Sequence, residues 1–110
     1  MREGEIAKMI KLEFYVTENY AEKVKDALFD AGAGRIGNYD RCSWETTGTG
    51  QFRPLEGSRP HIGEQNKTEQ VKELKIEMVC SEDLIEKVIS ALKSAHPYET
   101  PAYQYWKVEG

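Results

Sequence analysis

KMIKLEFYVTENYAEKVKDALFDAG, residues 8–32, is the stretch that decides the fold. Its first part alternates apolar and polar side chains between Ile10 and Val16, which is the period of a β-strand with one buried face. Its second part changes period, because apolar residues recur at helical spacing from Tyr20 until Gly32 supplies a stop signal. The stretch therefore predicts a strand that leads directly into an amphipathic helix.

The same pattern returns in the second half of the chain. Residues 71–80 alternate again, and Ser81-Glu82-Asp83 begins another helix. His96-Pro97 ends that helix, because the residue before a proline is displaced from the helical conformation. A last strand is expected over 102–108, with Tyr103 and Tyr105 on one of its faces. Each half thus predicts strand, helix, strand.

The long central segment, residues 32–67, is too long for a structureless connection in a compact domain. We expect a strand over 42–46, a turn at Thr47-Gly48-Thr49-Gly50 and a short return strand over 51–53. The resulting plan is β-α-β-β-α-β. It predicts an α+β, ferredoxin-like split βαβ fold, with an antiparallel sheet and two helices on one face.

Length and charge limit the possible functions. A chain of 110 residues is one domain, with its core over about 8–108. Its net charge of −4 has the wrong sign for binding nucleic acid. No apolar run is long enough to span a membrane, and no secretory signal is visible. Cys42 and Cys80 have no disulfide or zinc-site spacing, so a cytoplasmic location is expected.

The sequence Gly32-Ala33-Gly34-Arg35-Ile36-Gly37 spells GxGxxG. A dinucleotide fingerprint must follow a strand and open a helix, whereas these glycines follow a helix and lead toward a strand. We interpret them as a helix C-cap followed by a tight turn.

Four of the five arginines fall in the central segment, and the guanidinium group binds carboxylates and phosphates in a bidentate manner. These four are Arg35, Arg41, Arg53 and Arg59. The alternative, which the sequence favours, is that they pair with nearby acidic residues such as Asp40 and Glu45 and fix the loop or a subunit contact.

The run His96-Pro97-Tyr98-Glu99-Thr100-Pro101 combines an imidazole with a carboxylate. Both groups suit a divalent cation, and His61 or Cys42 could complete a site. The favoured alternative is a rigid turn, with His96 near a helix C-terminus. No serine lies in a nucleophile motif, so catalysis has little support.

Tyr15, Tyr103 and Tyr105 are expected on the sheet face that the helices leave open, among alternating lysines and glutamates. Amphipathic aromatic residues mixed with charges are typical of a surface that meets another subunit. This face predicts a homo-oligomer.

Four motifs together resemble the YqfO-type family: residues 32–44 (GAGRIGNYDRCSW), 48–57 (GTGQFRPLEG), 62–63 (IG) and 96–103 (HPYETPAY). In that family this unit is an insert within a dinuclear-metal protein, and stand-alone versions occur. The resemblance covers about residues 10–108. It implies the fold of CutA and of the PII signalling proteins, which are small ferredoxin-like trimers.

The resemblance also implies two kinds of ligand. PII proteins hold small anions in clefts between subunits, which corresponds here to Arg41 and Arg53, with Arg35 and Tyr39 in the same segment. CutA proteins share the His-Pro-Tyr-Glu motif and suggest divalent-cation binding at His96 and Glu99. The metal-binding core of full-length YqfO-type proteins has no counterpart here, so a hydrolase label borrowed from them would lack its chemistry.

The leading prediction is a non-catalytic CutA/PII-like homotrimer that binds a small anion or a divalent metal ion and has a sensing or regulatory role, without nucleic-acid or membrane partners. One alternative is a small metal-dependent hydrolase with a site composed across subunits from His96, Glu99, His61 and Cys42. The other is a purely structural oligomerisation domain.

Overall fold

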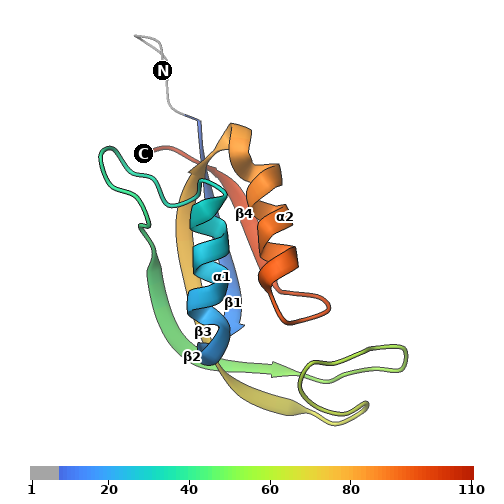
Figure 1. Cartoon of the computed structure of the whole chain (residues 1–110). Helices are drawn as coiled ribbons and strands as arrows, with labels where there is room; N and C mark the ends of the chain where they lie inside the picture. Colours follow the sequence, from blue (N-terminus) through green and yellow to red (C-terminus); the bar gives the residue numbers. More distant parts are fainter. Residues whose placement is uncertain (1–7) are drawn as a thin grey trace.

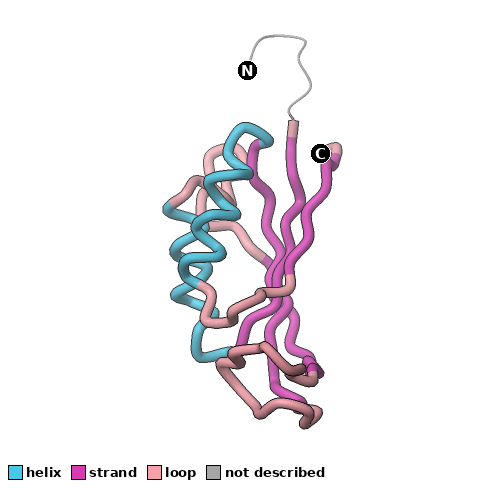
Figure 2. The backbone as a smooth tube through the Cα atoms, turned by 90° about the vertical axis from the view of Figure 1, so that its right-hand side faces the viewer, coloured by secondary structure: helices cyan, strands magenta, loops and turns pink. Residues whose placement is uncertain are grey.

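A computed structural model describes residues 8–110 as a four-stranded sheet with two helices. The elements are β1 (Met9–Thr17), α1 (Glu18–Asp30), β2 (Trp44–Phe52), β3 (Glu69–Ser81), the 3-10 turn η1 (Glu82–Leu84), α2 (Ile85–Ala95) and β4 (Tyr103–Val108). The strand order is β2-β3-β1-β4, and all neighbours are antiparallel. Both helices cover one face of the sheet, and no described element covers the other (Figures 1 and 2). The predicted ferredoxin-like α+β fold is confirmed.

The core lies between the sheet and the helices. The alternating positions of β1 and β3 supply one half of it, and the apolar stripes of α1 and α2 supply the other. Phe14, Leu28 and Leu92 have no exposed surface. Full burial of each such side chain stabilises the fold by roughly 1.5–3 kcal/mol. These contacts hold both helices over β1 and β3.

The helices end where the sequence predicted. Gly32 and Gly34 have φ of +108° and +82°, and the Gly34 amide donates to the Val79 carbonyl at 2.7 Å. The GxGxxG run is therefore a helix C-cap and turn that ties the end of α1 to the sheet. At the end of α2, His96 leaves the helical conformation with ψ of 135°.

The central segment differs from the prediction. Thr47-Gly48-Thr49-Gly50 is not a turn, because β2 runs unbroken and pairs with β3 from Trp44↔Glu77 to Phe52↔Glu69. The chain reverses after β2, in residues 53–68. The extended backbone persists because β3 supplies the hydrogen-bonding partners along its whole length.

The β2–β3 pair continues past the end of β1, which stops at Thr17↔Glu73. We call residues 48–73, the two strand ends and their connecting loop, the arm. Figure 1 shows the arm bending under the lower ends of α1 and α2. This bend places the loop of the arm near the turn that follows α2.

The prediction for the tyrosines of β4 is wrong. Directly paired residues share a face of the sheet, and the register pairs Tyr103 with Phe14 and Tyr105 with Leu12. Tyr103 and Tyr105 are therefore on the helix-covered face, and Trp106 is on the open face with Tyr15. Apolar residues occupy both faces of β4, so its pattern did not distinguish the two registers.

Candidate functional site

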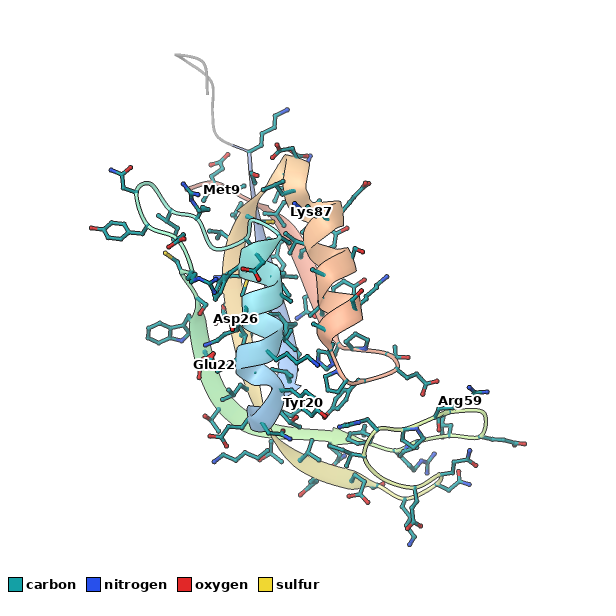
Figure 3. The ribbon with its side chains drawn as sticks, in the orientation of Figure 1. Met9, Tyr20, Glu22, Asp26, Arg59 and Lys87 are labelled. Carbon is teal, nitrogen blue, oxygen red and sulfur yellow. The ribbon has the colours of Figure 1, made fainter. Side chains whose placement is uncertain are left out.

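A cavity of about 560 Å³ lies at the lower end of β1, between the arm and the turn after α2. Most of its lining is aromatic or aliphatic, and the charged groups are few. The lining residues are Tyr15, Gly50, Gln51, Phe52, Arg53, Pro54, Leu55, Ser58, Pro60, His61, Ile62, Glu73, Tyr98, Glu99, Thr100 and Ala102. Concave apolar sites with a few polar groups are typical of small-molecule binding. Figure 3 shows Arg59 at the far end of the arm and Tyr20 at the lower end of α1.

His96 attaches the turn to β1. Its Nε2 lies 2.6 Å from the Tyr15 carbonyl oxygen, and its Nδ1 accepts the Tyr98 amide at 3.1 Å. The carbonyl can only accept, so Nε2 carries the proton and the ring is neutral. Burial lowers the pKa of His96, and the Tyr15 carbonyl and the Glu73 charge oppose that shift. Both ring nitrogens of His96 are thus hydrogen-bonded to backbone groups.

Tyr98 closes the inner wall of the cavity against the arm. Its hydroxyl donates to Glu73 Oε2 at 3.1 Å. A Cβ at Gly50 would collide with the Glu73 carboxylate, so the glycine makes room for that group. Burial, and then the charge and hydrogen bond of Glu73, raise the pKa of Tyr98 to about 12. The phenol therefore remains a donor at neutral pH.

His61 and Glu99 connect the loop of the arm to the rest of the chain. The His61 ring makes edge contact with Tyr20 at a centroid distance of 5.4 Å and lies 6.1 Å from Tyr98. The Glu99 carboxylate accepts the Arg59 amide at 2.7 Å. The sequence singled out His61 and Glu99 as possible ligands, but it assigned Tyr15 to a subunit surface and Gly50 to a turn, and it did not single out Glu73, which belongs to an ordinary strand pattern.

Arg53 is the cation of the cavity. It is exposed, belongs to the cavity lining and makes no ion pair with another residue of the described range 8–110. Arg41 contrasts with it, because its guanidinium pairs with Asp26 at 3.0 Å and Asp30 at 3.2 Å and lies over the Phe29 ring. Arg41 thus fastens the loop to α1, with Asp26 and Asp30 of that helix as its partners and not the acidic residues of the central segment that the sequence suggested.

The candidate residues fall into two groups. Arg53, His61 and Glu99 line the cavity, beside the buried His96. Arg35, Tyr39, Arg41 and Cys42 lie in the loop after α1, where Cys42 Sγ contacts the Asp40 carbonyl oxygen. Within residues 8–110, no three His, Cys, Asp or Glu side chains are grouped to share a metal ion. One chain therefore does not bring the four predicted metal ligands together.

A second groove, of about 370 Å³, lies next to the cavity on the open face. Its lining consists of Tyr15, Thr46, Thr47, Gly48, Thr49, Gly50, Glu73 and Lys75. Above it, the buried Glu13 accepts Gln104 Nε2 and pairs with Lys75 at 3.3 Å. The hydrogen bond and charge of Glu13 raise the pKa of Lys75. Tyr15, Gly50 and Glu73 line both depressions, so these three residues form the wall between them.

The described residues include no helix long and apolar enough to cross a membrane. No family model matches the chain.

The chain is related to one segment of larger curated proteins. It is 45% identical over 98 residues to the GTP cyclohydrolase 1 type 2 homolog of Halalkalibacterium halodurans, covering 89% of this chain and 26% of that protein. The homolog of the same name from Bacillus subtilis is 43% identical over 99 residues, covering 90% of this chain and 26% of that protein. The chain thus spans about a quarter of the length of these relatives.

Solved structures agree with the fold. A Bacillus cereus protein related to NIF3 has a TM-score of 0.82 and 40% identity, over 96% of this chain and 27% of that one. CutA from Synechococcus elongatus has a TM-score of 0.68 and 19% sequence identity, over 96% of this chain and 80% of that one. The periplasmic divalent cation tolerance protein CutA from Archaeoglobus fulgidus has a TM-score of 0.66 and 17% sequence identity, over 93% of this chain and 85% of that one. The CutA likeness supports the ferredoxin-like fold.

Proposed function

We propose that this chain is a non-catalytic, trimeric CutA/PII-like module that binds a small anionic ligand in the 560 Å³ cavity, in a sensing or regulatory role. The observation that carries the proposal is Arg53, an exposed guanidinium in the lining of a cavity with aromatic walls that has no ion pair inside residues 8–110. A guanidinium is the side chain best suited to bind a carboxylate or phosphate, and the aromatic walls suit an apolar part of the same ligand.

A trimer is supported by the open face of the sheet. Trp44 and Trp106 are 69% and 45% exposed. Both are on that face, because the register places Trp44 opposite Glu77 and Trp106 opposite Lys11. Between them, Lys11 pairs with Glu77 and Lys75 pairs with Glu13. Exposed tryptophans around a paired charge network favour burial against other copies. Light scattering should give the mass of three 12.6 kDa chains.

A divalent cation is the second candidate ligand. His61 and Glu99 line the same cavity and are the residues of the motif analysis that retain exposed polar atoms there. His96 contributes little to such a site, because both its nitrogens contact the backbone. The small metal-dependent hydrolase would need its remaining ligands from a neighbouring subunit.

Arg53→Ala tests the anion site. Thermal shifts with a panel of anionic metabolites and divalent ions would first identify a ligand, and calorimetry would then measure its affinity. Removing a charge-assisted hydrogen bond should weaken binding of an anion by roughly 1–3 kcal/mol. Arg35→Ala is the matched control, since Arg35 is also exposed but lies outside the cavity lining.

Three outcomes would contradict the proposal. Equal affinity of the Arg53→Ala variant and the wild type would return Arg53 to a structural role. Binding of no anion and no cation by a trimeric protein would instead favour the purely structural oligomerisation domain. A tightly held ion with a coordinated water would favour the hydrolase.

A further inference from the structure

Gly48 is a glycine with no explanation inside its own chain. It sits in the extended strand β2 without a positive φ, and a Cβ built on it would meet nothing within 4 Å. Gly50, two residues further along the strand, is explained by the Glu73 carboxylate. A glycine inside a strand is unfavourable and commonly marks a place where another molecule approaches closely. Gly48 therefore leaves open space on the surface of β2, into which a side chain of another molecule can fit.

The surroundings of Gly48 form the floor of the groove on the open face. The register pairs Gly48 with Glu73, and Tyr15 and Lys75 stand at the rim. With a volume of about 370 Å³, the groove accommodates a large aromatic side chain. It lies on β2, which is one edge of the sheet.

Trp106 lies on the same open face at the opposite edge, on β4, and 45% of its surface is exposed. β2 and β4 run antiparallel to each other within the sheet. If the sheet of one copy continues into the next, β4 of one chain lies antiparallel to β2 of its neighbour, and the open faces join. Such an arrangement pairs the free backbone groups of both edges.

The two edges are chemically compatible. Placing Trp106 opposite Gly48 brings residues 104–108 against residues 46–50. Lys107 is the one charged residue in the first segment, and the second segment has none, so no like charges meet. The contact joins two different patches and is therefore head-to-tail, which closes into a ring when repeated by rotation.

We infer that Trp106 of one copy packs on Gly48 of the next and fills the groove on its open face. This inference rests on the trimer of the proposed function and adds its contact. Because Tyr15, Gly50 and Glu73 form the wall between groove and cavity, the partner's Trp106 would support the ligand site from behind.

The test is a substitution at Gly48 whose new side chain occupies the groove. Gly48→Leu has room in its own chain but occupies the place of the partner's Trp106. We expect light scattering to give one chain for this variant at a concentration where the wild type gives three. Lys72→Leu is the control, because Lys72 is exposed, is not part of the groove lining, and is on the face that the helices cover; this variant should stay trimeric.

Cysteine pairing provides a second measurement, which also decides the question if Gly48→Leu fails to fold. Gly48→Cys with Trp106→Cys, in a Cys42→Ser background and treated with a thiol oxidant, should give covalent species of two and three chains on a non-reducing gel. Lys72→Cys with Trp106→Cys should give none, because Lys72 is outside the groove lining. The remaining Cys80 is buried and is not exposed to the oxidant.

The outcomes separate the inference from the proposed function. A trimeric wild type whose Gly48→Leu variant also keeps three chains overturns the Trp106 contact and leaves the trimer standing. A single-chain wild type over a wide concentration range overturns both.

Discussion

At the scale of single residues, His96 shows how one motif fits two functions until its geometry is known. The sequence offered it as a metal ligand or as part of a rigid turn. In the structure its two nitrogens contact the Tyr15 carbonyl and the Tyr98 amide, and the ring is buried. The imidazole thus holds the turn against β1 and thereby shapes one wall of the cavity.

His96 should make stability depend on pH. Its folded-state pKa lies below the ordinary value of about 6.5, so its contribution is complete above that pH and is lost as the pH falls through the folded-state pKa. We expect the free energy of unfolding to fall more for the wild type than for His96→Gln between about pH 8 and about pH 5. Denaturant titrations at each pH measure it.

His61→Gln is the control for this experiment, because His61 is the other histidine of the chain and is exposed. His61→Gln should change the pH dependence of unfolding less than His96→Gln does, because the His61 charge is the smallest of the contributions to the lowered pKa of His96. Parallel curves for the wild type and His96→Gln would show that protonation of His96 is not coupled to unfolding.

At the scale of elements, the arm is the part that turns a common fold into a molecule with a cavity. Three residues from three segments hold its position: Gly50 in β2, Glu73 in β3 and Tyr98 in the turn after α2. Because Gly50 has no side chain, there is room for the Glu73 carboxylate, and this carboxylate accepts a hydrogen bond from the Tyr98 hydroxyl. The shape of the cavity depends on this contact.

Gly50→Ala should break the contact by displacing the Glu73 carboxylate. We expect a loss of about 1 kcal/mol in the free energy of unfolding, comparable to the loss for Tyr98→Phe. The double variant should lose little more than either single one, because both changes remove the same interaction. Denaturant unfolding of the four proteins measures the coupling, and Thr49→Ala controls for a change of propensity in β2. Fully additive losses would contradict the link.

At the scale of the whole molecule, the sheet has one face that no described element covers (Figure 2). The face is not uniformly apolar, since paired lysines and glutamates occupy its centre and tryptophans its two edges. This arrangement leaves the largest apolar contacts at the edges, where head-to-tail copies would meet.

Trp106→Glu should therefore reduce the assembly to single chains, because the new carboxylate would face the partner surface around Gly48 and its register partner Glu73. Tyr105→Glu should leave the trimer intact, since Tyr105 is on the helix-covered face. Light scattering of the two variants compares neighbouring positions in one strand. Dissociation of the Tyr105 variant alone would assign the contact to the other face.

The sequence by itself determined the fold class, the two strand–helix units and the C-cap role of the GxGxxG run, because these follow from local periodicity and backbone preference. The tertiary structure decided the rest. Pairing with β3 kept Thr47–Gly50 extended, and the register moved Tyr103 and Tyr105 to the covered face. Long-range contacts also separated Arg53 in the cavity from Arg41 on α1. A strand's register and a loop's neighbours depend on residues far away in the chain, so no local pattern contains them.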